Sequence, residues 1–152
     1  MTNVDLARSI LDDSSYVVLA TADATGMPWA SPVWFAQEDY RELFWVSFPG
    51  ARHSQNIAAR PQIGMVVFDS TATPGAGQAV YMRADCEQVQ DPTSLASGMA
   101  VFSRKAERQG MPAWGTERVS GEARLRLYRA RVREHSILDP DSPYDERVDV
   151  RP

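Results

Sequence analysis

Residues 42–68 read ELFWVSFPGARHSQNIAARPQIGMVVF and predict a strand, a short helix and a second strand in direct succession. The first seven residues are rich in aromatic and β-branched side chains, which favour strands. A proline and a glycine then interrupt the pattern, and the following residues have the composition of a helix that Pro61 ends. The apolar run after this proline is typical of a buried strand. The segment therefore places a short helix between two strands of a sheet.

The rest of the chain extends this sheet. Short polar links join neighbouring strands, among them Asp-Ala-Thr-Gly at 23–26, whose glycine suits a hairpin turn, so the strands are expected to run antiparallel. Six strands with few helices predict a closed or half-open barrel. The expected strands are 16–22, 30–36, 42–48, 62–68, 78–89 and 124–132, and the expected helices are 3–13, 51–60 and one that begins after the cap Asp91.

The chain length of 152 residues fits one domain. We expect this domain to span residues 1–138. The segment 139–152 is polar, and it predicts either a disordered tail or an arm ordered by a partner subunit.

Composition excludes several classes of protein. The formal net charge of −4 gives no long-range attraction to nucleic acid or to anionic membrane surfaces, so we expect neither as a partner. No apolar run is long enough for a membrane span and no signal peptide is recognisable, which predicts a cytoplasmic protein. Cys86 is the single cysteine, so the chain can form neither an internal disulfide nor a cysteine-rich metal site. The excess of arginine over a single lysine is typical of a GC-rich bacterial genome.

Arg52, His53 and Ser54 stand at the start of the predicted helix. A helix N-terminus carries partial positive charge, so two basic residues there are unfavourable unless an anion lies between them. Phosphate is a usual ligand at such a terminus, where arginine and a serine hydroxyl also donate hydrogen bonds. The alternative is a solvated surface turn without a ligand.

This arrangement resembles the flavin-binding split barrels related to pyridoxamine 5′-phosphate oxidase. In that family a strand ends in a hydroxyl residue, and two basic residues five and six positions later hold the phosphate of FMN. Here the strand ends at Ser47, and Arg52 and His53 occupy those two positions. The resemblance covers roughly residues 5–132. It implies a mainly β (α+β) fold, a six-stranded antiparallel split β-barrel with short flanking helices, which works as a homodimer with its sites at the interface.

The resemblance also assigns the other cofactor contacts. Residues 30–35, ASPVWF, look like the family's second strand along the flavin ring, and residues 77–81, GQAVY, look like the strand whose glutamine reaches the FMN of the other subunit. The implied FMN-binding residues are Ser31, Pro32, Val33, Trp34, Val46, Ser47, Arg52, His53, Ser54 and Gln78. Catalytic residues and a metal site are not indicated.

Two departures from the family bear on the substrate. The lysine that oxidase relatives carry at the end of the second strand is replaced by Ala36, and the helix around 95–104 lacks their tyrosine and arginine spacing. The resemblance therefore implies a flavin-dependent oxidoreductase acting on an unidentified small organic molecule. Two alternatives remain open, a reductase that uses the deazaflavin F420 and a non-enzymatic flavin or haem carrier or sensor, for which His53 and His135 are the only histidine ligands.

Overall fold

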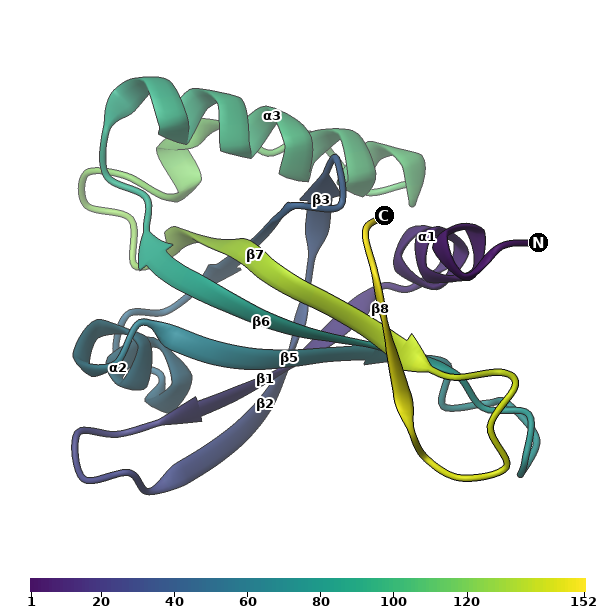
Figure 1. Cartoon of the computed structure of the whole chain (residues 1–152). Coiled ribbons are helices and arrows are strands. Elements are labelled where there is room, and N and C mark those ends of the chain that lie inside the picture. The colour runs from purple at the N-terminus through teal and green to yellow at the C-terminus, as the bar shows by residue number, and fades with distance from the viewer.

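The computed structural model describes residues 1–152, which form one strongly curled antiparallel sheet with three α-helices around it (Figure 1). The strands are β1 (Tyr16–Ala22), β2 (Pro28–Trp34), β3 (Ala36–Glu38), β4 (Glu42–Ser47), β5 (Gln62–Phe68), β6 (Ala79–Gln88), β7 (Arg126–Leu138) and β8 (Arg147–Val150). The helices are α1 (Asn3–Asp13), α2 (Arg52–Ala59), α3 (Pro92–Arg108) and the short 3₁₀ turn η1 (Thr116–Arg118). No helix combines the length and the apolar character that crossing a membrane requires.

The sheet is a split barrel, as expected. Its strand order is β2-β1-β5-β6-β7-β4-β3, and β8 pairs with β7 outside this path. The two end strands of the path, β2 and β3, are separated in the chain by Phe35 alone. One buried residue thus carries the chain from one edge of the curled sheet to the other, which closes the barrel at that point and leaves it open elsewhere.

The strand prediction needs three corrections. The expected strand 30–36 is divided at Phe35, so that Ala36 belongs to β3 rather than to β2. The link after it is not a polar loop but the β3–β4 hairpin, whose turn residues Asp39 and Tyr40 both have positive φ angles, 49° and 57°. Such a turn usually contains glycine, and its absence here is why the turn was not recognised from the sequence. The last strand extends to Leu138 instead of ending at 132.

The tail is also different from the expectation. Residues Arg147–Val150 form β8, which pairs antiparallel with His135–Leu138 of β7 in the same chain. Val150 is buried against the barrel core, whereas its neighbour Asp149 is exposed. This alternation of two valines with charged residues is a strand pattern that the polar composition of the segment concealed. The end of the tail is therefore an ordered strand of the same sheet.

Apolar side chains form two layers. The larger cluster fills the barrel and includes Trp45, Leu19 and Phe35, while the smaller one lies between the outside of the sheet and α3 and includes Phe44, Leu127 and Phe102. β4 supplies both because its side chains alternate between the two faces. Gly98 lets α3 approach the sheet closely, since a Cβ atom there would lie 2.8 Å from Leu127 Cδ2 and 2.9 Å from Phe44 Cε1.

Lys105 is a buried cation at the junction of α3 with the sheet. Its side chain is 7% exposed, and its Nζ donates to the backbone oxygens of Ser14, at 2.8 Å, and Phe35, at 2.5 Å. These oxygens belong to the residue before β1 and to the link between β2 and β3. The only lysine of the chain therefore fixes the point at which the barrel closes. Burial, together with the nearby charge of Arg108, lowers the pKa of Lys105 to about 8.

Candidate functional site

A cavity of about 770 Å³ opens between the edge of the barrel and the C-terminal end of α3. One side, the strand wall, consists of Pro32, Val33, Trp34, Val46 and Ser47. The opposite side, the helical wall, consists of Phe102, Gln109, Met111, Trp114 and Leu125. Ser15, Tyr16 and His53 complete the lining. The strand wall comes from β2 and β4, and the helical wall comes from α3 and the loop between α3 and β7 (Figure 1).

Ser47 and His53 meet at the polar end of the cavity. His53 Nε2 lies 2.9 Å from Ser47 Oγ, so the last residue of β4 and the second residue of α2 are joined across the Pro-Gly turn. Burial lowers the pKa of His53 below its usual value of 6.5, which keeps the imidazole neutral at pH 7 in the free protein. This pairing brings two residues of the predicted phosphate site together.

The beginning of α2 lacks a side-chain cap. Ala51 occupies the N-cap position and makes no capping hydrogen bond, in contrast to Thr2 at α1 and Asp91 at α3. The first residues of α2 therefore present backbone N–H groups without a helical partner. Such groups and the partial positive charge of the helix end form a suitable site for an anion.

Arg52 is exposed and lies beside the cavity rather than in it. Its guanidinium stacks over the Trp29 ring, 4.2 Å from the centroid, and it makes no ion pair. The two residues line a smaller neighbouring hollow together with Gln55 and Asn56 of α2. The structure thus places Arg52 at the first position of α2, with its side chain held by an aromatic contact only.

An aromatic chain links the two walls. Trp34 meets Phe102 edge to face with ring centroids 4.8 Å apart, and Phe102 meets Trp114 in the same manner at 5.4 Å. Trp34 Nε1 donates to Gln109 Oε1 at 2.9 Å, and Gln109 Nε2 donates to Ser15 Oγ at 3.1 Å. These contacts fix the end of α3 against the mouth of the barrel and give the cavity a rigid apolar interior.

Six of the ten residues predicted to bind the cofactor line this cavity: Pro32, Val33, Trp34, Val46, Ser47 and His53. Ser31 precedes them on β2 without lining it. Ser54 is buried in the first turn of α2, and its hydroxyl has no hydrogen-bond partner. Gln78 is remote from the cavity of its own chain and donates from Nε2 to the Leu138 oxygen at 2.8 Å.

The sequence did not indicate the helical wall. Its residues lie near the C-terminal end of α3 and in a following loop that contains glycine and proline, where no pattern marks a binding surface. The available signal was the presence of Met111 and Trp114, two large apolar residues in an otherwise polar connection. The backbone N–H of Trp114 donates to Ser103 Oγ at 2.8 Å, which holds the loop on α3.

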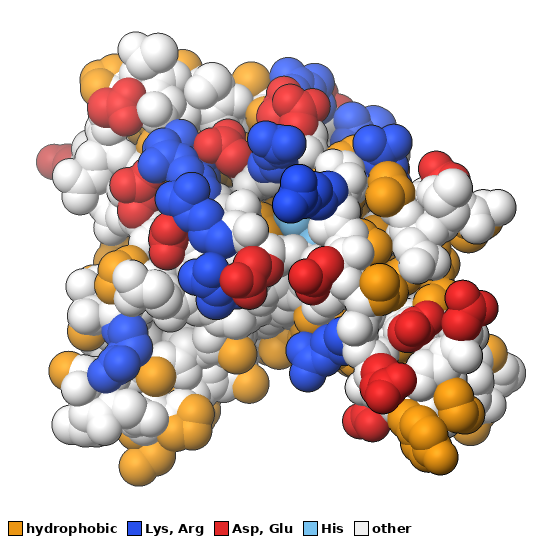
Figure 2. Space-filling view, viewed as in Figure 1, with side chains coloured by type: hydrophobic (Ala, Val, Ile, Leu, Met, Phe, Trp, Pro, Cys, Tyr) orange, Lys and Arg blue, Asp and Glu red, His pale blue; other side chains and the backbone are white.

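The arginines of the last strand face away from the cavity. Arg129, Arg131 and Arg133 alternate with Glu42, Glu87 and Asp85 in ion pairs, and Figure 2 shows this stripe of mixed charge on the face formed by β6 and β7. Arg126 donates to the backbone oxygens of Gly121, Ala123 and Leu125. His135 is also distant, because its Nε2 donates to the Tyr40 oxygen at 2.7 Å in the region of β8. No group of three or more potential ligands forms a metal site.

Solved structures with a similar fold belong to proteins with different names and functions. The heme storage protein HutZ from Vibrio cholerae is 22% identical, with 88% of this chain and 92% of that chain covered and a TM-score of 0.70. An F420 reductase is 24% identical, with 85% and 94% covered and a TM-score of 0.61. A putative pyridoxamine 5′-phosphate oxidase from Listeria innocua is 15% identical, with 88% and 96% covered and a TM-score of 0.64. At these identities the likeness concerns the fold alone.

Among curated protein sequences, none matches this chain significantly. The family model for pyridoxamine 5′-phosphate oxidase, in contrast, matches residues 4–137, which include the whole barrel apart from the last residue of β7 and β8. The matched region contains both walls of the cavity and the uncapped helix α2. The chain therefore belongs to the pyridoxamine 5′-phosphate oxidase family.

Proposed function

We propose that the protein is an FMN-dependent oxidoreductase whose cavity holds the flavin ring, with the FMN phosphate at the start of α2. The observation that supports this proposal is that the uncapped start of α2 adjoins the strand wall of the cavity. The uncapped helix end with Ser47, His53 and Arg52 suits a phosphate, and the adjoining strand wall suits a flat apolar ring. Ser54 fits this assignment through its backbone N–H.

The flavin, when bound, supplies the capacity to accept and donate a hydride or single electrons. The protein's own residues have the tasks of binding and orientation. Trp34 is fixed by its hydrogen bond to Gln109 and by its contact with Phe102, so it forms a firm surface beside the ring site. The α3 end and the following loop cover the opposite side and limit the access of water.

The decisive measurement is the absorption spectrum of the purified protein, followed by mass spectrometry of the released cofactor. FMN is expected. F420 would give a different spectrum and would support the deazaflavin alternative. Haem is the second candidate that a specific observation favours, because His53 is the one histidine in a mostly apolar cavity and could act as an axial ligand. A haem spectrum that disappears in His53→Ala would replace the flavin assignment.

The affinity for FMN is expected to fall as the pH rises. Burial holds the pKa of His53 below 6.5 in the free protein, and an adjacent phosphate favours the imidazolium and raises that pKa in the complex. Binding therefore takes up a proton between the two pKa values, and affinity is lost as the pH rises through the pKa of the complex. We expect the dissociation constant to increase about two- to tenfold from about pH 6.5 to 8.5. His53→Gln should remove this slope; an equal slope in the variant would contradict the role of His53.

We also propose that the protein is a homodimer. β2 is an edge strand, and Trp29 on it is exposed together with Tyr16, Phe48 and Phe68, which leaves apolar surface around the cavity. The resemblance assigns Gln78 to the site of the other subunit, and this fits its distance from the cavity of its own chain. Light scattering of the FMN-bound protein should give twice the mass of one chain; a monomer with bound FMN would refute this assembly.

Pyridoxamine 5′-phosphate itself is expected not to be oxidised at a useful rate. Its dianionic phosphate needs cations in the cavity, and none of the thirteen lining residues is an arginine or a lysine. Lys105 donates hydrogen bonds to two backbone oxygens, and Arg104 forms an ion pair with Glu38 at 3.2 Å. The substrate is added without air to FMN-loaded protein and flavin bleaching is followed. Bleaching within seconds would show that the substrate phosphate finds another binding site.

A further inference from the structure

The cavity contains almost no charge. Of its thirteen lining side chains, none is acidic and none is arginine or lysine. His53 is the only one that ionises near neutral pH, and it lies at the end of the cavity assigned to the FMN phosphate. The helical wall is thus uncharged along its whole extent, although 24% of the residues of the chain are charged.

The polar atoms of the cavity are largely paired with each other. Gln109 accepts a hydrogen bond from Trp34 Nε1 and donates one to Ser15 Oγ, so both the oxygen and the nitrogen of its amide have a partner. Ser47 and His53 are joined in the same way at the opposite end. Among the lining residues of its own chain, a ligand facing the helical wall therefore meets neither a counter-charge nor an array of free donors, and an ionised group buried against this wall would lack a partner there.

The shape of the helical wall favours a flat ligand. Phe102 and Trp114 present ring surfaces and edges, and Met111 adds a flexible thioether that packs well against aromatic rings. Because Phe102 is held between Trp34 and Trp114 by edge-to-face contacts, this surface is rigid. It is suited to one planar face rather than to a branched or strongly solvated molecule.

We propose that the substrate bound against the helical wall is an uncharged, flat, conjugated molecule. The proposal rests on the assignment of the strand wall to the flavin, since the substrate then occupies the remaining side of the cavity. The proposal concerns binding alone, so a molecule that does not react can test it. It complements the expectation that pyridoxamine 5′-phosphate is not oxidised, because it states which kind of molecule the cavity suits.

The test uses two inert probes of equal ring size, naphthalenemethanol and naphthoate, titrated by calorimetry into FMN-loaded protein. The neutral alcohol is expected to bind at least about tenfold more tightly than the carboxylate, because the carboxylate loses its hydration without gaining a partner. Equal affinity for the two probes, or no binding of either, would overturn the proposal.

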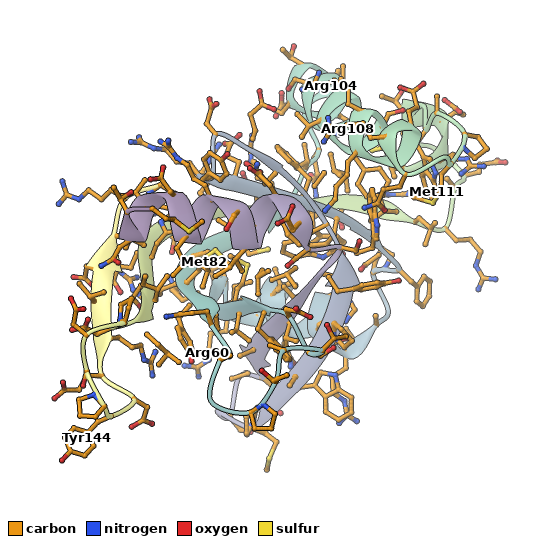
Figure 3. The ribbon with its side chains drawn as sticks, turned by 90° about the vertical axis from the view of Figure 1, so that its right-hand side faces the viewer. Arg60, Met82, Arg104, Arg108, Met111 and Tyr144 are labelled. Atoms are coloured by element: carbon orange, nitrogen blue, oxygen red, sulfur yellow. The ribbon has the colours of Figure 1, made fainter.

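A change of charge in the helical wall should reverse this preference. Met111 is 39% exposed and lines the cavity, so Met111→Arg introduces a cation without disturbing the core. The variant is expected to bind naphthoate about tenfold or more tightly than the natural protein does. Tyr144→Arg is the matched control, since Tyr144 is 75% exposed and Figure 3 shows it on the opposite side of the molecule from Met111. Naphthoate affinity that rises equally in both variants would contradict the proposed position of the ligand.

The two proposals fail in different ways. An FMN titration precedes each probe titration, and the probes are also titrated without FMN. Absence of FMN binding together with the neutral preference and the Met111→Arg reversal would refute the proposed cofactor but support an uncharged ligand at the helical wall. Normal FMN binding without any preference between the probes would refute the inference about the substrate and leave the cofactor assignment intact.

Discussion

Arg52→Ala is expected to weaken FMN binding by about ten- to a hundredfold, because a charge-assisted hydrogen bond contributes about 1.5–3 kcal/mol. Arg52 is exposed, forms no ion pair and is held by its contact with Trp29 alone, so the side chain is free to turn to a phosphate at the start of α2. Loss of the cation–π contact should lower the free energy of unfolding by only about 0.5–1 kcal/mol. Fluorescence titration of FMN and a denaturation curve measure the two effects separately.

Two controls make the role of Arg52 specific. Riboflavin lacks the phosphate, so its affinity should be nearly unchanged in Arg52→Ala. Arg60→Ala removes the same charge from the other end of α2, where the guanidinium donates to the oxygens of Asp23, at 3.2 Å, and Ala24, at 3.3 Å, and it should leave FMN affinity unchanged (Figure 3). A loss of riboflavin affinity as large as the loss for FMN would show that Arg52 acts on the shape of the site rather than on the phosphate.

The architecture around α2 was predictable because its determinants are local. Pro49 and Gly50 end β4, and Pro61 prevents α2 from continuing, so both boundaries follow from backbone chemistry within a few residues. The alternation in β6 was equally visible, and its buried face contains Val80, Met82, Ala84 and Cys86 as expected. The Asp39–Tyr40 turn escaped prediction because contacts with distant residues stabilise it. Tyr40 Oη donates to Asp12 on α1, and the Tyr40 oxygen accepts from His135 on β7.

The same distinction applies to the cavity. The strand wall and His53 lie within or next to elements that the pattern identifies, so a family resemblance was sufficient to mark them. The helical wall depends on pairs far apart in the chain, such as Gln109 with Ser15 and Trp34 with Gln109. Such pairs arise only when α3 docks on the barrel, for which Gly98 and the cluster around Phe44 provide the close approach. No local rule connects these positions, so the helical wall could not be predicted from the sequence.

The structural role of Lys105 also depends on contacts that only the fold brings together. In the sequence it is only the single lysine of the chain, and in the structure it is a buried cation that joins α3 to Ser14 and Phe35. Lys105→Met keeps the length and the packing of the side chain but leaves two buried carbonyl oxygens without their donor. An unpaired buried acceptor costs about 1–3 kcal/mol. The variant recovers part of this loss at neutral pH, because it no longer buries a charge.

The effect of Lys105→Met should therefore grow with pH. The pKa of Lys105 is about 8 in the folded protein and 10.5 in the unfolded chain, so the unfolded chain binds more protons between these values and the natural protein gains stability as the pH rises through this window. The difference in unfolding free energy between the natural protein and the variant should increase between about pH 8 and pH 10 by up to about 2 kcal/mol. Urea denaturation at several pH values measures it.

Arg83→Met is the matched control for this pH dependence. It also removes a cation, but from an exposed ion pair with Glu134 whose side chains are 52% and 66% exposed. Such pairs contribute about 0–1 kcal/mol, and neither partner titrates between about pH 8 and 10. Arg83→Met should thus shift stability slightly and by the same amount throughout the window. If Lys105→Met gives an equally flat difference, the ammonium keeps its proton throughout, and its two carbonyl partners then outweigh the cost of burying its charge.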